Sequence, residues 1–334
     1  MVGIQDVAER AGVSLTTVSH AIHHAERVSE SLRLRVEAAI AELGYRPNPQ
    51  AQSLRTGRTN VVATLIPDVL NPYFTDLVKT VQTELGRSGL DALIFNTDVP
   101  GGHAEQHGRE YLRQISGKRV DGLIVGDVAL NGMHEHFLDL DIPAVFVGHL
   151  SNGAIDSVRA DSFQGAHMMG AYLAGKGHRR IAHITGPSVF TEAAIRRDGF
   201  EAGLADHGIE VADDLRFEGS FLEPSGRQAV EWLLARHGRQ MPSAIFFANY
   251  LMAIGALAEF YDRGIQVPRD IAVCVFEDLP QLEYVRPRLT RVGLRPSVLA
   301  ERATQMLLDR LSNTYGGPPR AEIIPCALRV FDSA

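Results

Sequence analysis

The sequence predicts an α/β protein that has a small helical head and a larger core of two lobes. Up to residue 60, short helical patterns occur without any β-branched run, whereas from Asn60 onward apolar strands alternate with amphipathic helices. The strands are also too many for one sheet. We therefore expect two doubly wound lobes of parallel strands, with a cleft between the lobes that binds a small molecule.

Seven apolar segments are the strongest strand candidates. They are continuous rather than alternating, which is typical of parallel sheets that are covered on both faces. One intervening segment, residues 72–86, repeats its apolar side chains at helical spacing. The seven segments span residues 61–66, 90–95, 120–125, 143–147, 180–184, 243–247 and 271–276.

The composition is that of an ordinary globular protein. Of the 334 residues, 45% are hydrophobic and 22% are charged. No run approaches the roughly 18 apolar residues that a membrane helix needs, and the first residues lack the apolar segment of a signal peptide. We therefore expect a cytoplasmic protein that does not enter membranes. Cys274 and Cys326 lie in strand-like runs, so we expect buried, reduced thiols.

The charge is distributed unevenly along the chain. The net charge is −7, which argues against nucleic acid binding. The first 60 residues, however, hold seven arginines and six acidic residues, a net charge of +1, so the remaining residues carry −8. This asymmetry permits DNA contact by the first segment but does not establish it.

The first 43 residues fit three short helices. Residues 4–10 suit one helix, Gly12 supplies a turn, and Ser14 is a candidate N-cap for the second helix. A third helix over residues 29–43 has Ser29 as its candidate cap. This pattern is that of a helix-turn-helix, whose second helix enters the major groove of DNA. Spacing alone leaves a generic three-helix bundle open. The residues of the second helix that should face inward are Val18, Ala21 and Ile22.

Two N-terminal segments resemble a known family. IQDVAERAGVSLTTVSHAIH and RVSESLRLRVEAAIAELGYRPNPQAQSLRTGRT closely resemble the head and hinge of the lactose-repressor (LacI/GalR) family, and TTVSH is most similar to the purine repressor. The resemblance continues through LIPDVLNPYFTDLV, HRRIAHITGP, RRDGF and VPRDIAVCVFEDLP, so it covers essentially the whole chain. It implies a transcriptional repressor that binds a pseudo-palindromic operator as a homodimer or higher oligomer. It also implies control by a small effector in the cleft.

The same resemblance implies a domain division. Residues 1–46 correspond to the helix-turn-helix head and residues 47–60 to a hinge helix and linker. Residues 61–334 correspond to the effector-binding and dimerisation core, a two-lobed fold like that of periplasmic binding proteins. Its first lobe would comprise residues 61–160 and 292–320, and its second lobe residues 161–291 and 321–334.

The resemblance also places DNA contacts on particular residues. The base-reading positions of the family fall on Leu15, Thr16 and His20. Leu15 cannot form a hydrogen bond to a base, so we expect it to read a thymine methyl group or DNA shape. Thr17, Ser19 and the backbone amides near Ser14 would hold phosphates. In the hinge, the apolar wedge that enters the minor groove falls on Leu54, and the residues beside it are Ala51, Gln52 and Arg55.

For the effector cleft, the resemblance points first to Arg196 in AIRRDGF. Its guanidinium would bond ligand oxygens, although a surface arginine is the alternative. Asn249 in FFANY and Asp161 in RADSFQG match polar positions of the family. Tyr73 and Phe74 in NPYF could stack on a ligand ring, and core packing is an equally good role for Phe74.

Three positions depart from the family's pattern at this cleft. Tyr250 follows Asn249 where an aspartate is usual, Glu277 replaces a shorter aspartate, and Leu294 replaces a glutamine. The loss of polar groups makes a plain hexose less certain, because a sugar site needs several fixed donors and acceptors. We expect a carbohydrate or related metabolite in contact with Tyr250 and Glu277. A larger or more apolar ligand, or none, stays open, as does inducer against corepressor.

Other functional classes have weaker support. GAYLAGKG lacks the Ser or Thr of a phosphate loop and is better explained as a helix end, and HAEQH lacks a third metal ligand. We therefore expect no catalytic residue, no metal and no cofactor. The alternatives are a transporter's solute-binding protein and an α/β enzyme that uses the same cleft; turnover of a metabolite would favour the enzyme.

Overall fold

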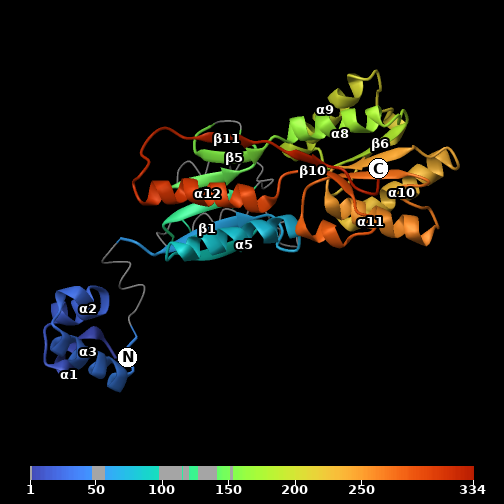
Figure 1. The fold of residues 1–334 in the computed structure, drawn as a ribbon. Helices are drawn as coiled ribbons and strands as arrows, with labels where there is room; N and C mark the ends of the chain where they lie inside the picture. Colours follow the sequence, from blue (N-terminus) through green and yellow to red (C-terminus); the bar gives the residue numbers. More distant parts are fainter. Residues whose placement is uncertain (1, 47–56, 98–114, 116–119, 127–140, 151–152) are drawn as a thin grey trace. The chain divides into compact units, whose positions relative to one another are not determined.

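A computed structural model describes residues 2–46, 57–97, 115, 120–126, 141–150 and 153–334 (Figure 1). The chain forms two compact units, Met1–Thr59 and Asn60–Ala334. The first unit contains the predicted head. The second contains both predicted lobes of the core.

The head is built from three α-helices and one short 3-10 turn. These are α1 (Ile4–Ala11), α2 (Leu15–His23), η1 (Ala25–Arg27) and α3 (Glu30–Leu43). They enclose a small apolar core to which every α-helix contributes, with Ala21 and Ile22 packed at its margin as the spacing predicts. The fully buried members of this core are Val7, Val18 and Val36.

The turn between α1 and α2 forms as predicted, with one addition. Gly12 adopts a left-handed conformation (φ 64°) after α1, and the Ser14 hydroxyl accepts a hydrogen bond from the Thr17 amide at 3.1 Å. Arg35 from α3 donates to the Ala11 carbonyl at 2.5 Å, so the third helix braces the end of the first. Ser29 stands at the N-cap of α3 but makes no capping hydrogen bond.

The first lobe of the core holds a six-stranded sheet in the order β11-β5-β4-β3-β1-β2, in which all pairs are parallel. Helices α5 (Pro72–Arg87) and α12 (Pro296–Leu311) pack on each other and against this sheet (Figure 1). The strands are β1 (Val61–Ile66), β2 (Asp91–Asn96), β3 (Gly122–Gly126), β4 (Ala144–Val147), β5 (Asp156–Ala160) and β11 (Ala321–Ile324).

The second lobe holds another six-stranded sheet, in the order β12-β10-β9-β8-β6-β7, in which only β12 is antiparallel to its neighbour. Figure 1 shows α8 (Ser162–Gly175) and α9 (Thr191–Ala205) on one side of it. Helices α10 (Glu223–His237) and α11 (Tyr250–Asp262) lie on the other side. The strands are β6 (Ile181–Thr185), β7 (Arg216–Glu218), β8 (Ala244–Phe247), β9 (Ala272–Phe276), β10 (Thr290–Gly293) and β12 (Ala327–Arg329), and the short 3-10 turns are η3 (Asp213–Leu215) and η4 (Pro280–Tyr284).

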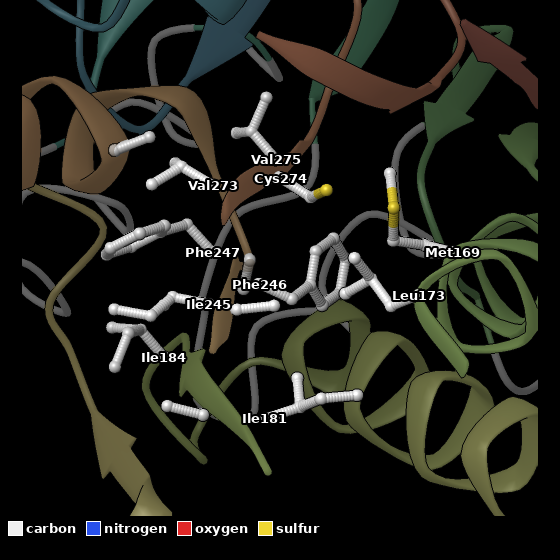
Figure 2. Packing of buried hydrophobic residues seen from close by; sticks show 14 of the residues in the cluster. Met169, Leu173, Ile181, Ile184, Ile245, Phe246, Phe247, Val273, Cys274 and Val275 are labelled. Carbon is white, nitrogen blue, oxygen red and sulfur yellow. The ribbon is translucent and has the colours of Figure 1, made fainter. Parts of the chain in front are cut away.

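The second lobe contains the largest apolar core of the described residues (Figure 2). Side chains from β6, β8 and β9 pack there against α8, which is what continuous apolar strands predict. Cys274 is part of this core, and Cys274 and Cys326 are both buried free thiols, as expected. All seven predicted strands are present, each shifted by no more than two residues.

The sequence-based lobe boundary needs one correction. Residues 321–334 were expected in the second lobe, but β11 pairs in parallel with β5 at the edge of the first sheet. The chain enters the second sheet only with β12, which pairs with β10. Four residues of edge strand have no pattern that assigns them to either sheet, so pairing alone decides. The GAYLAGKG segment ends α8, whose last residue is Gly175, as predicted; HAEQH lies outside the described residues.

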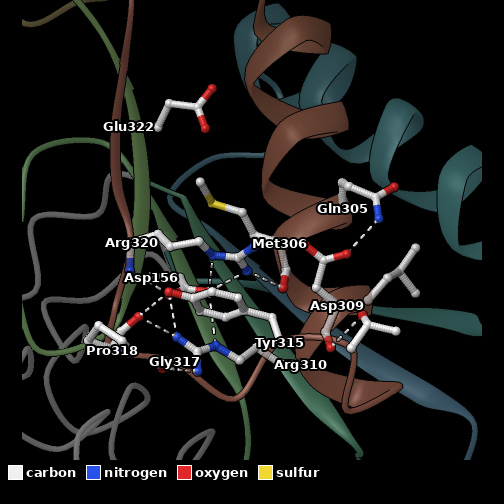
Figure 3. Close-up of polar contacts among 12 residues, drawn as sticks. Asp156, Gln305, Met306, Asp309, Arg310, Tyr315, Gly317, Pro318, Arg320 and Glu322 are labelled. Carbon is white, nitrogen blue, oxygen red and sulfur yellow. Dashed lines mark hydrogen bonds and ion pairs between the residues drawn. The ribbon is translucent and has the colours of Figure 1, made fainter.

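A buried ion cluster fastens β11, β5 and α12 together (Figure 3). Asp156 in β5 is 2% exposed and accepts hydrogen bonds from the guanidinium groups of Arg310 at 2.8 Å and Arg320 at 2.7 Å. The Tyr315 ring lies 4.5 Å from the Arg310 guanidinium and 4.2 Å from that of Arg320. The segment that leads from α12 into β11 is therefore held in place by charge as well as by strand pairing.

Candidate DNA-binding face and effector cavity

Helix α2 presents a polar face to solvent. Leu15 is 44% exposed and Thr16 is also exposed, whereas Val18 on the opposite face is fully buried. His20 and Ser19 are partly exposed. The face that the sequence assigned to DNA is thus free of core contacts at its N-terminal end.

The first turn of α2 can hold an anion. Thr17 donates its amide to Ser14, while the amides of Leu15 and Thr16 belong to the first turn, where no carbonyl four residues back lies within the helix. Such amides, together with the helix dipole, favour a phosphate oxygen. The Ser14 and Thr17 hydroxyls lie 2.9 Å apart beside this turn. The predicted hinge residues, Ala51, Gln52, Leu54 and Arg55, lie outside the described residues.

The core contains a cavity of about 400 Å³. Its size is within the range of small-molecule sites, roughly 300–1,000 Å³. Five aromatic rings and ten polar side chains line it. The aromatic residues are Tyr73, Phe74, Phe190, Phe221 and Phe276. The polar residues are Asp68, Asn71, Thr97, Arg159, Ser162, Glu192, Arg196, Ser220, Asn249 and Glu277.

Both sheets contribute to the cavity through the carboxyl ends of their strands. Pro67 follows β1, Thr97 follows β2 and Arg159 lies in β5 of the first sheet. On the second sheet, Asn249 follows β8 and Phe276 ends β9. Ligands of doubly wound sheets bind at these ends, so the cavity lies where the predicted topology requires it.

Arg196 lies at the cavity wall, as predicted. Its guanidinium donates to the Ala248 carbonyl at 2.8 Å and lies 4.2 Å from the centre of the Phe276 ring. Its Nε is buried and has no hydrogen-bond partner. These contacts fix the guanidinium and leave one donor unused.

Glu277 is a buried carboxyl group of the same wall. It is 7% exposed, and its Oε2 accepts a hydrogen bond from the Tyr250 amide at 3.1 Å. Burial raises its pKa to about 7, although the nearby Arg196 and the Tyr250 amide act in the opposite direction. Its backbone has a φ of 105°, which is strained for a residue with a side chain, and such strain concentrates at functional sites.

Asn249 lines the cavity but spends its side chain on the protein. Its Oδ1 accepts from the Met252 amide at 3.1 Å and caps α11, and its Nδ2 donates to the Phe221 carbonyl at 2.8 Å. Phe221 has a φ of 63°, and its ring occupies the space that a Cβ at Gly186 would fill. Asn249 and Gly186 therefore seat the Phe221 ring at the cavity.

Two predicted effector residues do not line the cavity. Asp161 accepts a hydrogen bond from the Gln164 amide at 3.2 Å and caps α8, while its neighbour Ser162 faces the cavity. Tyr250 reaches the site only through its amide, and its ring packs against the second-lobe core. Leu294, the residue that replaces a glutamine, lines the cavity, as do Tyr73 and Phe74.

Comparisons with known proteins agree with this architecture. Residues 3–48 match the profile of "Bacterial regulatory proteins, lacI family", and residues 171–333 match a "Periplasmic binding protein-like domain". The chain is 33% identical to the HTH-type transcriptional repressor PurR of Pectobacterium atrosepticum, over 94% of this chain and 91% of that one. It is 32% identical to the ribose operon repressor of Escherichia coli K12, over 97% and 98%. The chain belongs to the lacI family of bacterial regulatory proteins.

Solved structures of LacI-family proteins share the fold of this family member over its full length. A Lac repressor dimer bound to operator and the anti-inducer ONPF superposes with a TM-score of 0.85 at 25% identity, over 99% of this chain and 98% of that one. A complex of the transcriptional regulator CelR with cellobiose gives a TM-score of 0.74 at 27% identity, over the whole of both chains. This LacI-family chain is thus a transcriptional regulator with a DNA-binding head and an effector-binding core, not an enzyme.

Sequence reasoning missed several cavity residues of this LacI-family protein. Arg159 lies two residues before the predicted Asp161, and Glu192 lies one helical turn before Arg196. The i, i+4 spacing from Arg196 could have indicated Glu192. Phe190, Phe221 and Phe276 carried no such signal, because an isolated phenylalanine reads as core.

Two absences hold for the described part of this LacI-family chain. Among these residues, no helix combines the length and the apolar character needed to cross a membrane. The same residues include no group of three or more His, Cys, Asp or Glu side chains that could hold a metal ion.

Proposed function

We propose that this chain is a repressor that binds a pseudo-palindromic operator as a homodimer and responds to a small polyhydroxylated effector in the core cavity. The observation that carries the proposal is the arrangement of α2, which exposes Leu15 and Thr16 at its N-terminal end and buries Val18. Such a helix is held by its bundle on one side and offers the other to base edges. A repressor acts where the DNA is, so we also place it in the cytoplasm.

Base reading would fall to Leu15, Thr16 and His20. Leu15 would meet a thymine methyl group, and His20 would bond to a purine N7 or O6 atom. Thr17, Ser19 and the first amides of α2 would hold phosphates, which fixes the helix on the duplex without reading sequence. In the hinge, Leu54 would wedge into the minor groove beside Ala51, Gln52 and Arg55.

Homodimer formation is supported by exposed apolar side chains on the core. Leu93 and Ile94 are 44% and 43% exposed on β2, an edge strand among the described strands of its sheet. Leu70, just before α5, is 85% exposed. Exposed apolar groups at a sheet edge favour a protein partner. Two heads on two half-sites then require a second copy of this chain.

The effector class is inferred from the cavity and from two relatives. Aromatic rings suit the apolar faces of sugar rings, and polar groups between them suit hydroxyls. The similar CelR was solved with cellobiose, and another relative is a ribose operon repressor. A carbohydrate or related metabolite therefore fits best, with contacts from Arg196, Glu277, Tyr73 and Phe74.

The proposal can be tested by operator binding with and without candidate effectors. An operator is first selected from random duplexes with the full-length protein, and its symmetry is read. We expect a palindrome bound by one dimer, and a sugar that changes operator affinity by about 5- to 150-fold, the usual range of such coupling. The absence of any bound duplex would refute the regulator, and an operator indifferent to every sugar and purine tested would refute the effector.

His20 provides the sharpest test of the DNA-reading face. Replacing it by alanine should cost roughly 1–3 kcal/mol at particular base pairs, because a base-specific hydrogen bond is lost. Fluorescence anisotropy with single-base operator variants measures this. His207→Ala, an exposed histidine of the core, serves as the control. A loss that is uniform over all operator variants would mark His20 as a phosphate contact instead.

A further inference from the structure

Glu192 occupies an unusual place for an acid in the first turn of a helix. It is the second residue of α9, where a carboxylate commonly faces its own helix dipole. No capping hydrogen bond joins its side chain to α9. Instead its Oε2 accepts a hydrogen bond of 2.6 Å from the Ser162 hydroxyl of α8. The side chain therefore reaches across to the neighbouring helix at the cavity wall.

The Ser162–Glu192 pair is held rigidly because α8 and α9 pack backbone to backbone. A Cβ at Gly199 would lie 2.3 Å from the Phe163 carbonyl oxygen, and one at Gly203 would lie 2.1 Å from the His167 carbonyl oxygen. Only glycine permits this approach. Ser162 is 1% exposed and Glu192 is 9% exposed, so neither side chain has room to turn away.

One carboxyl oxygen of Glu192 is left without a partner. Among the described residues, seven buried side-chain atoms make no hydrogen bond, and two of them are Glu192 Oε1 and Arg196 Nε. Both residues line the cavity, and they stand one helical turn apart on α9. One is an acceptor and the other is a donor. A buried polar atom without a partner costs free energy that a bound ligand can restore.

We infer that Glu192 is a specificity-determining residue of the cavity, which requires a hydrogen-bond donor on the effector. A hydroxyl group donates to Oε1 while an adjacent hydroxyl accepts from Arg196 Nε, because a hydroxyl does both. Neighbouring hydroxyls of a polyol match this pair. An ammonium group would satisfy Glu192 but would meet the positive charges of Arg196 and Arg159 in the same cavity. This inference rests on the proposed effector function.

The test compares sugars that differ by one hydroxyl. Binding of D-ribose, D-glucose and cellobiose, and of their monodeoxy counterparts, is measured by calorimetry on the full-length protein. In the wild type, at least one deoxy analogue should bind about tenfold or more weakly than its parent, since it leaves a buried acceptor unpaired. In Glu192→Met, which keeps the length of the side chain without its oxygens, parent and analogue should bind equally.

Two further variants separate this role from a structural one. Glu192→Gln keeps one carboxamide oxygen, so we expect discrimination between that of the wild type and that of Glu192→Met. Asp198→Asn makes the same chemical change on the exposed face of α9 and should keep the wild-type ratio. Thermal unfolding and operator affinity without sugar show that each variant is folded.

Three outcomes would overturn the inference. Glu192→Met may not retain the wild-type ratio between a sugar and its deoxy analogue, the wild type must bind at least one of these sugars, and amino sugars must not bind more tightly than their hydroxyl parents. The proposed function fails separately. If operator binding is found and sugars bind the wild type but leave operator affinity unchanged, then effector control is refuted while the role of Glu192 stands.

Discussion

Glu277 combines burial, a strained backbone and a raised pKa at the cavity wall. Because its pKa is about 7 in the folded protein and near 4.5 in an unfolded chain, the folded state holds a proton that the unfolded state has lost between these values. The stabilisation is complete below pH 4.5 and is lost as the pH rises through about 7. Above that pH, folding must bury an ionised carboxylate.

Glu277→Gln should remove this pH dependence. The glutamine cannot ionise, and its oxygen can still accept from the Tyr250 amide. The variant should therefore gain stability relative to the wild type as the pH rises from 5 to 8, by about 3 kcal/mol at most. Thermal unfolding of both proteins at several pH values measures the difference. Glu301→Gln, an exposed site on α12, should show no such trend, and a flat difference for Glu277→Gln would contradict the raised pKa.

At the same scale, individual cavity residues show what sequence could and could not predict. Arg196 was predictable because its motif brings a guanidinium to the strand ends, and it lies there. Asn249 was expected to touch the effector, yet both of its amide atoms bond to the protein. Phe221 was not foreseen, because its place depends on a left-handed backbone and on Gly186, which are distant in sequence.

Among the elements, α12 and β11 depend on the charge cluster around Asp156. Burial raises the pKa of this carboxyl, but the hydrogen bonds from Arg310 and Arg320 outweigh burial and hold the pKa below its usual value. Asp309 bonds to Arg320 at 2.7 Å and completes the network. Replacing one member of a buried network leaves the others charged and unpaired, which is costly.

Asp156→Ala should therefore destabilise the core by about 3–5 kcal/mol, the usual cost of an uncompensated buried charge. Urea unfolding followed by circular dichroism measures the loss. Asp198→Ala removes a carboxylate from an exposed pair with Arg197 and should cost less than about 1 kcal/mol. Equal effects of the two substitutions would mean that the cluster adds no stability.

The elements also show how far periodicity reaches. Long apolar runs predicted seven strands and α5 closely, because strands buried on both faces leave a strong pattern. Short strands such as β7 and β12 have three residues each and were not predicted. The assignment of β11 to the first sheet depends on Asp156 and on pairing with β5, which no local pattern encodes.

For the whole molecule, the head and the core are separate compact units, so a signal between cavity and operator must pass along the chain that joins them or through the dimer. Coupling of this kind is reciprocal. An effector that weakens operator binding by a given factor has its own affinity lowered by operator through the same factor. Effector titrations with and without operator therefore decide between inducer and corepressor from the sign alone.

Leu54 gives a way to separate operator affinity from effector affinity. If its side chain wedges between base steps, Leu54→Ala loses contacts that offset the cost of kinking DNA, and operator affinity should fall at least about tenfold. Effector affinity of the free protein should be unchanged, because the cavity is lined by core residues alone. Mobility-shift titration and calorimetry measure the two. Leu34→Ala, which shortens an exposed leucine of α3, is the matched control. Equal operator affinity for Leu54→Ala and wild type would exclude the wedge, and a matching loss of effector affinity would place Leu54 in the fold of the core instead.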